Sequence, residues 1–317
     1  MSYQSERFIR SLKMMTSEDE IASHPQRLTH VGDWCAERNA CFVALDSYTI
    51  RWLTGFTGSN GIIYLDQNCQ VLFTDSRYAE QAPVEIAGHG VDVNCVIGSD
   101  PFKKIAELAR KRNLHLDGEK CSWSAKEKIE RLIEGDVIDA HKFCLELRCI
   151  KDKGEIEKIR TAAEITCVAL DNALAELNTE TTERELARNI ESFMIEHGAL
   201  RAAYPPIIAA GKNSALPHAR PSDQRILDTN LLLVDVGANF EGYCSDMTRM
   251  IPLSKLSKEQ ERASQIVLDA QIKAIESIRP GIRAKEVDAI CRDILSNAIS
   301  GGEFLHGTGH GVGLEIH

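Results

Sequence analysis

Three histidines and four glycines lie within the last twelve residues, His306-Gly-Thr-Gly-His310-Gly-Val-Gly-Leu-Glu-Ile-His317. Glycine has no side chain, so a backbone with a glycine at every second position can pass close to a ligand or a metal ion. A single histidine is usually an ordinary core or surface residue, but three of them, four and seven residues apart among glycines, are rarely incidental. This segment therefore predicts a binding site that uses histidine side chains.

Two aspartates upstream form a second chemical signal. Asp235 follows the apolar run Leu231–Val234, as expected at the end of a buried strand, and Asp246 comes eleven positions later, beyond turn residues. A hairpin would place the two strands about 5 Å apart. Two adjacent carboxylates repel each other unless a proton or a cation intervenes, and a divalent metal removes that cost. The alternative, a strand-end cap and an unrelated turn residue, remains open for the pair alone.

Together with His310, the two aspartates form a mostly hard set of oxygen and nitrogen ligands. Such a set suits Mn²⁺, Co²⁺ or Zn²⁺ and differs from the thiolate ligands of a structural zinc site. His218 lies in Asn213-Ser-Ala-Leu-Pro-His218-Ala-Arg220, after an expected strand and turn. Taken alone, it is typical of an ordinary loop histidine.

The composition argues against several classes of protein. A net charge of −10 and a pI near 5.5 disfavour a nucleic-acid partner, because phosphate backbones are bound by basic faces. The ten cysteines include no Cys-x-x-Cys pair, so neither a zinc knuckle nor a thioredoxin-type motif is supported. No signal-peptide core opens the chain, and no window approaches the ~20 apolar residues of a membrane span. We expect a cytoplasmic protein with reduced thiols and no membrane partner.

Residues 1–150 have the pattern of an α/β domain. Short apolar or alternating runs predict strands at residues 41–45, 61–65, 71–74 and 91–96. The turn residues between the second and third runs predict a hairpin. Capping residues and periodicity predict helices at residues 100–112 and 124–134.

Residues 151–317 have a different pattern, in which apolar residues recur with helical periodicity over long stretches. Residues 155–177 predict a helix whose apolar face comprises Ile156, Ile159, Ala163, Cys167, Leu170 and Leu174. Capping boxes at Thr182–Glu185 and Ser257–Gln260 open further helices. Strands are expected at residues 206–210, 231–236 and 243–252, and later helices at residues 257–279 and 284–299. The order helix, helix, strands then begins again, which indicates a duplicated unit whose second copy is unfinished.

In these aspartates and histidines the chain resembles the pita-bread metallopeptidases: Xaa-Pro aminopeptidase, prolidase and, more distantly, methionine aminopeptidase. Arg51-Trp-Leu-Thr-Gly-Phe-Thr-Gly58 and Phe73-Thr-Asp-Ser-Arg-Tyr78 resemble the creatinase-type N-terminal domain of the proline-specific members. The resemblance implies a two-domain α/β fold. A creatinase-like domain would occupy residues 1–150, and a pita-bread α+β catalytic domain, lacking its C-terminal part, residues 151–317.

The resemblance also implies a role for each candidate. Asp235, Asp246 and His310 match the family's metal ligands, with Asp246 bridging two divalent ions, Mn or Co foremost and Zn as an alternative. The remaining histidines match those that line the substrate pocket, namely His218, His306 and His317. Of these, His218 and His317 would bind the substrate carbonyl and stabilise the tetrahedral intermediate. The implied activity is hydrolysis of the peptide bond before proline in proline-containing peptides, by a homodimer.

The chain departs from the family at its end. The family completes its site with two glutamates downstream of the last histidine, and this sequence stops at His317. Neither Glu303 nor Glu315 is placed like those glutamates, so we expect a truncated form of an active enzyme.

Three other functions remain open. A non-catalytic relative that binds a partner protein fits the missing glutamates but gains nothing from clustered acids. Creatinase uses no metal, which the metal-type aspartates disfavour. Methionine aminopeptidase normally lacks a large N-terminal domain. The choice between dipeptidase and aminopeptidase activity is not decided by the sequence.

Overall fold

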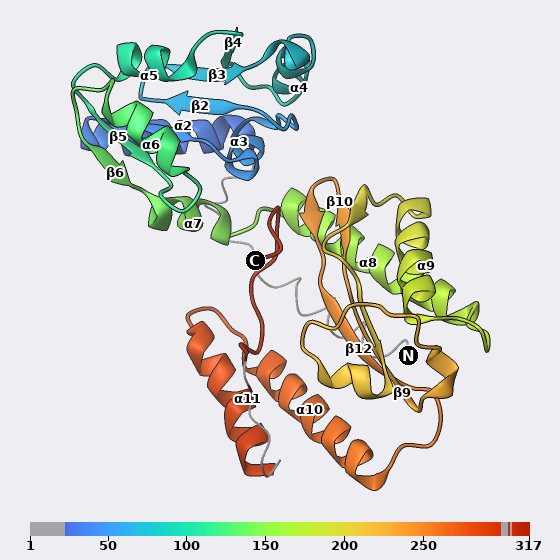
Figure 1. Cartoon of the computed structure of the whole chain (residues 1–317). Helices are drawn as coiled ribbons and strands as arrows, with labels where there is room; N and C mark the ends of the chain where they lie inside the picture. The colour runs from blue at the N-terminus through green and yellow to red at the C-terminus, as the bar shows by residue number, and fades with distance from the viewer. Residues whose placement is uncertain (1–22, 299–303, 305) are drawn as a thin grey trace. The chain divides into compact units, whose positions relative to one another are not determined.

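The computed structural model describes residues 23–298, 304 and 306–317, and it divides the chain into two compact units, residues 1–154 and 155–317. Over these residues, the first unit has one sheet and the second has two (Figure 1). Each unit has its own buried apolar core. The site residues predicted above all belong to the second unit, so the first unit is described only briefly.

The first unit is built on one six-stranded mixed sheet with strand order β4-β3-β2-β1-β5-β6. Its strands are β1 (Ala40–Ala44), β2 (Ile62–Leu65), β3 (Gln70–Thr74), β4 (Asn94–Ile97), β5 (Asn113–Leu116) and β6 (Val137–Asp139). The hairpin β2–β3 is antiparallel, as predicted, and β1 pairs with β2 antiparallel and with β5 parallel. Its helices are α2 (His24–Arg38), α3 (Ser47–Thr54), α4 (Gln81–Gly88), α5 (Pro101–Ala109), α6 (Trp123–Glu130) and α7 (His141–Cys149).

Every residue of β1 is buried, because helices cover both faces of the sheet. On one face, Val43 packs in a cluster with Ile105 of α5 and Ile129 of α6. On the other face, the ring of Phe42 meets Phe143 of α7 edge-on, with centroids 5.8 Å apart. This packing explains why β1 reads as a continuous apolar run in the sequence.

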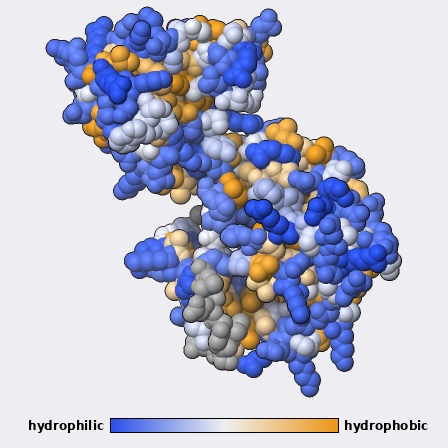
Figure 2. Space-filling view, in the orientation of Figure 1, coloured by the Kyte–Doolittle hydropathy of each residue, from blue (hydrophilic) through white to orange (hydrophobic). Residues whose placement is uncertain are grey.

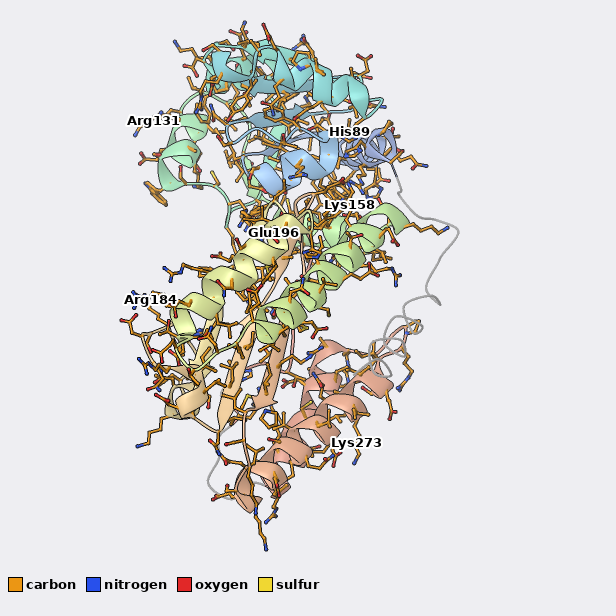
Figure 3. The ribbon with its side chains drawn as sticks, turned by 90° about the vertical axis from the view of Figure 1, so that its right-hand side faces the viewer. His89, Arg131, Lys158, Arg184, Glu196 and Lys273 are labelled. Atoms are coloured by element: carbon orange, nitrogen blue, oxygen red, sulfur yellow. The ribbon has the colours of Figure 1, made fainter. Side chains whose placement is uncertain are left out.

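The second unit packs α8 (Lys153–Ala175) and α9 (Glu183–Glu196) against two small sheets. One sheet has the order β11-β10-β7 and the other β12-β9-β8. The strands are β7 (Arg201–Ala202), β8 (Ile207–Ala210), β9 (Leu231–Val236), β10 (Ala238–Phe240), β11 (Tyr243–Cys244) and β12 (Met247–Pro252). Figure 3 shows α8 with Lys158, and α9 with Arg184 and Glu196, lying along the strands.

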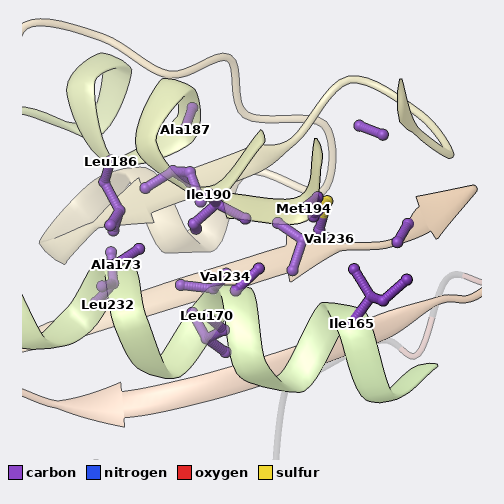
Figure 4. Close-up of a cluster of buried hydrophobic side chains, with 14 of the residues drawn as sticks. Ile165, Leu170, Ala173, Leu186, Ala187, Ile190, Met194, Leu232, Val234 and Val236 are labelled. Atoms are coloured by element: carbon purple, nitrogen blue, oxygen red, sulfur yellow. The ribbon is translucent and has the colours of Figure 1, made fainter. Parts of the chain in front are cut away.

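Apolar side chains fill the space between these helices and β9. Leu170 of α8 and Ile190 of α9 are packed in one cluster with Leu232 and Val234 (Figure 4). Helices α10 (Lys258–Ser277) and α11 (Ala284–Ala298) follow and pack on each other through a smaller cluster around Ala270, Ala274 and Cys291. Both predicted capping boxes are present, at Thr182 and Ser257.

The predicted apolar face of α8 was right in part, since Leu170 is buried and Leu174 packs against the same core. Its buried residues are Glu155, Ala162, Ile165, Thr166, Ala169, Leu170 and Ala173. Cys167 and Ala163, which the prediction placed inside, are exposed. Small alanines face the strands because they permit a close approach. The buried Thr166 is tolerated because its hydroxyl finds hydrogen-bond partners.

Several element bounds also differ from the predictions. Helix α5 ends at Ala109 and helix α6 at Glu130, both earlier than expected. Strand β4 begins at Asn94, later than expected. The expected strand over residues 243–252 is divided into β11 and β12 at Asp246. The end of the last helix at residue 299 lies outside the described residues.

In the part of the chain that the structure describes, no helix combines the length and the apolar character needed to cross a membrane. On the face drawn in Figure 2, the surface is mainly hydrophilic, with smaller hydrophobic areas between. All ten cysteines are free thiols.

The first unit contains a pH-sensitive contact at the start of α7. Nδ1 of His141 lies 2.9 Å from Oδ1 of Asp117, and this hydrogen bond is the main cause that raises the pKa of His141. A raised pKa means that the stabilisation is complete below the unfolded value of about 6.5 and disappears as the pH rises through the folded value. We expect His141→Gln to lower the melting temperature by roughly 1–2 °C at pH 5.5 and by less at pH 8.5. Thermal unfolding at the two pH values measures this, and an equal effect at both would contradict it.

Candidate metal centre

The hairpin that carries the two aspartates forms as predicted. Asp235 is the fifth residue of β9, and Asp246 directly precedes β12. The two strands are antiparallel, and Met247 pairs with Val236. The short strands β10 and β11 lie between them in the sequence and form their own antiparallel turn. The chain therefore returns to β9 with Asp246 beside the end that carries Asp235.

Gly237 makes this return possible. A Cβ atom at this position would lie 1.9 Å from the carbonyl oxygen of Ser245 and 3.0 Å from the ring of Tyr204. No residue with a side chain fits there without displacing the backbone that leads into Asp246. The glycine is required by close approach, not by an unusual backbone angle.

A buried pair of hydroxyls fixes the same segment to α8. Oγ of Ser245 lies 2.8 Å from Oγ1 of Thr166, and Ala238 N donates to both oxygens. Ser245 also donates to the carbonyl of Ala162. Both hydroxyls are thus satisfied, and the residue before Asp246 is held in place from two directions.

Tyr204 brings the two carboxylates together, and sequence reasoning missed it. Its hydroxyl lies 2.6 Å from Oδ1 of Asp235 and 2.8 Å from Oδ1 of Asp246. A phenol has one proton and can donate it to only one of two acceptors at a time. Two acidic groups therefore share one donor. The sequence offered no signal for this, since the contacts span 31 and 42 residues.

The electrostatics of this pair favour a cation. Burial is the main cause that raises the pKa of Asp235, and the charge of Asp246 raises it further, against the hydrogen bond from Tyr204. Burial, followed by the hydrogen bond to Asp235, also raises the pKa of Tyr204. A divalent ion between the carboxylates would supply the positive charge that one shared hydroxyl proton cannot.

His310 joins the aspartates from the end of the chain. Its Nε2 lies 3.2 Å from Oδ2 of Asp246, and its ring is 4.4 Å from that of His317, centroid to centroid. The segment is anchored where Cys244 N donates to the carbonyl of Gly313, at 2.7 Å. Leu314 is buried beside this anchor.

Helix α11 holds the start of the same segment. Asp288 accepts from the backbone N and the hydroxyl of Thr308, and Arg292 donates to the carbonyls of Phe304 and His306. The hydrogen bond from Arg292 is the main cause that lowers the pKa of Asp288 to about 2. The sequence analysis did not identify these two anchors.

The structure does not bring the other two predicted histidines to the aspartates. His218 is exposed on the loop after β8, and His306 is exposed with its ring against Phe304. Within residues 23–298, 304 and 306–317, no group of three or more histidine, cysteine, aspartate or glutamate side chains is arranged to hold a metal ion. Asp235, Asp246 and His310 fit a metal site by their chemistry: the Tyr204 hydroxyl contacts both carboxylates, and His310 contacts Asp246.

Comparison with known proteins gives the family. Residues 157–317 match the model of metallopeptidase family M24, and residues 27–150 match the creatinase/prolidase N-terminal domain. The chain belongs to family M24. It is therefore a member of a hydrolase family whose members use divalent metal ions. Its fold is a creatinase-type N-terminal domain followed by a pita-bread catalytic domain.

Individual relatives support the assignment of the chain to family M24. An uncharacterized peptidase, YqhT, of Bacillus subtilis is 32% identical over 84% of the chain and 76% of that protein. The Xaa-Pro dipeptidase of Pyrococcus furiosus is 44% identical over 54% of the chain and 49% of that enzyme. That sequence match covers about half the length of the dipeptidase. Among solved structures, an Xaa-Pro dipeptidase from Bacillus anthracis is similar with a TM-score of 0.83 and 29% identity, covering 93% of this chain and 82% of that one.

Proposed function

We propose that this protein hydrolyses the peptide bond that precedes proline, as an Xaa-Pro dipeptidase or aminopeptidase. The observation that carries the proposal is the shared hydroxyl of Tyr204, which joins Asp235 and Asp246 at a place that His310 also reaches. The names of the Pyrococcus and Bacillus anthracis relatives support proline as the residue after the cleaved bond.

Asp235, Asp246 and His310 would be among the residues that hold two divalent ions. We propose Mn²⁺ or Co²⁺, with Zn²⁺ as an alternative, because oxygen ligands predominate. When bound, such ions polarise a carbonyl and make water a nucleophile near neutral pH.

The protein's own groups then have defined tasks. Asp235 supplies negative charge from β9 and Asp246 from the residue before β12, in a segment that Gly237 and the Ser245 hydroxyl hold in place. We assign His317, whose ring lies against that of His310, the donation of a hydrogen bond to the substrate carbonyl oxygen as that oxygen gains charge. We assign His218 the same kind of task from its loop, and His306 the lining of the substrate pocket.

Substrate hydrolysis tests the proposal. The protein at its native length, incubated with Mn²⁺, is offered Ala-Pro, Ala-Pro-Ala and Ala-Ala, and the release of the first residue is measured. We expect hydrolysis of one or both proline peptides at least about a hundredfold faster than of Ala-Ala, since a pocket shaped for a ring discriminates in the transition state. Cleavage of Ala-Pro alone defines a dipeptidase. Equal hydrolysis of Ala-Ala, or no hydrolysis of any peptide, would refute the proposal.

We also propose that the protein is a homodimer in the cytoplasm, without nucleic-acid or membrane partners. The ten free thiols and the acidic composition support this environment and this lack of partners. Closed twofold symmetry is the commonest assembly of soluble enzymes.

A further inference from the structure

A carboxylate outside the candidate metal centre is buried completely. Glu183 is the first residue of α9, and its relative exposure is 0%. Its Oε1 accepts from Ala210 N at 2.6 Å and from the amide of Asn213 at 3.0 Å. Its Oε2 accepts from Ser222 N at 2.9 Å and from the Ser222 hydroxyl at 2.6 Å. The Glu183 side chain therefore accepts hydrogen bonds from three residues that lie 27 to 39 positions away in the sequence.

These donors lie at the two ends of one loop. Ala210 is the last residue of β8, Asn213 lies in the short 3-10 helix Gly211–Ala215 that opens the loop, and Ser222 ends the loop. The backbone strengthens the closure, since Arg184 N donates to the carbonyl of Ser222. Loop 211–222 is thus closed into a ring at the carboxylate of Glu183.

The start of α9 does not require this carboxylate. Thr182 and Glu185 form a complete capping box, in which the side chain of each accepts from the backbone N of the other. An anion is costly to bury, and Glu183 is compensated by the neutral donors that contact it and by the positive end of the helix. Helix capping therefore does not explain why the Glu183 carboxylate is buried, whereas its hydrogen bonds to the loop do.

Between the closed ends, the loop carries His218. This residue is exposed, while its neighbour Ala219 is buried and donates through its backbone N to the carbonyl of Leu216. The backbone position of His218 is therefore set by the loop, whose ends are joined at Glu183.

We propose that Glu183 is a positioning residue: its buried carboxylate closes loop 211–222 and so fixes where His218 is presented to the substrate. The part of this inference that concerns the substrate rests on the proposed function. The part that concerns the loop stands on the hydrogen bonds alone.

Glu183→Gln tests the inference in the full-length protein, because glutamine keeps the size but replaces one acceptor oxygen with a donor that faces other donors. We expect amide hydrogen exchange at Ala210 and Ser222 to become at least about tenfold faster, with the amides of β9 unchanged. The NMR signal of the His218 ring, assigned with His218→Ala, should shift or broaden. The value of kcat/KM for Ala-Pro should fall at least about tenfold, with Mn²⁺ affinity within about twofold of the original.

Glu185→Gln is the matched control, since it alters the same helical turn without touching the loop. It should leave loop exchange, the His218 signal and kcat/KM close to the original values. If Glu183→Gln does not fold, Ser222→Ala removes one donor and keeps the carboxylate, and it should show the same changes to a smaller degree.

Two results would overturn the inference: unchanged loop exchange in Glu183→Gln, or faster exchange without any change in the His218 signal and in kcat/KM. If the original protein hydrolyses no proline peptide, the proposed function fails by itself. The exchange and NMR measurements then still decide whether Glu183 positions His218.

Discussion

Asp246→Asn should lower kcat/KM for a proline dipeptide on the order of a thousandfold, the largest single effect in the molecule. Asp246 contacts both Tyr204, through Oδ1, and His310, through Oδ2. Asparagine keeps the shape but removes the charge, and its amide would turn a donor toward one of these partners. Metal affinity should fall together with activity.

The stability of this variant separates a metal role from a structural one. Removing one of two neighbouring negative charges relieves repulsion, so the metal-free variant should melt no lower than the metal-free original. The rise in melting temperature that Mn²⁺ gives the original should be lost. Asp171→Asn, at an exposed position of α8, is the control and should behave as the original does. An undiminished rise with Mn²⁺ in Asp246→Asn would contradict the assignment.

Gly237→Ala should destabilise the protein by about 2–3 kcal/mol, because the added methyl group would lie 1.9 Å from the backbone oxygen of Ser245. The neighbour is backbone, so a rotamer change cannot relieve the clash. The displaced segment leads directly into Asp246, and metal affinity should fall as well. Denaturant unfolding and Mn²⁺ titration measure the two effects.

A matched glycine provides the control for this substitution. Gly88, at the end of α4, has no atom within 4 Å of a Cβ built on it. Gly88→Ala should therefore change stability by less than about 0.5 kcal/mol. If Gly237→Ala were as stable as Gly88→Ala, the close approach at Ser245 would not constrain the hairpin.

Local patterns predicted the hairpin of the metal centre well. An apolar run, a turn and a second strand were enough to place Asp235 near Asp246, because strand pairing across a short connection follows from period and turn chemistry. The capping boxes were found for the same reason, since their partners are three residues apart. The metal-ligand roles themselves came from family resemblance and stay predictions.

Contacts between distant residues could not be predicted in the same way. Tyr204 and Glu183 look like an ordinary aromatic and an ordinary surface acid in the sequence, and only the fold brings their partners to them. The buried face of α8 was predicted only in part, because periodicity selects apolar residues alone. The packed face combines Ile165, Leu170 and alanines with Thr166 and Glu155, whose burial depends on hydrogen bonds from other elements.

The most direct test of the account is the rate of Ala-Pro hydrolysis as a function of added Mn²⁺, after dialysis of the native-length protein against a chelator. The account predicts no hydrolysis without metal, and a saturable return of activity that Asp235→Asn abolishes. Hydrolysis that persists in chelator, or that returns equally in Asp235→Asn, would show that the site built on Asp235, Asp246 and His310 is not the metal centre of a peptidase.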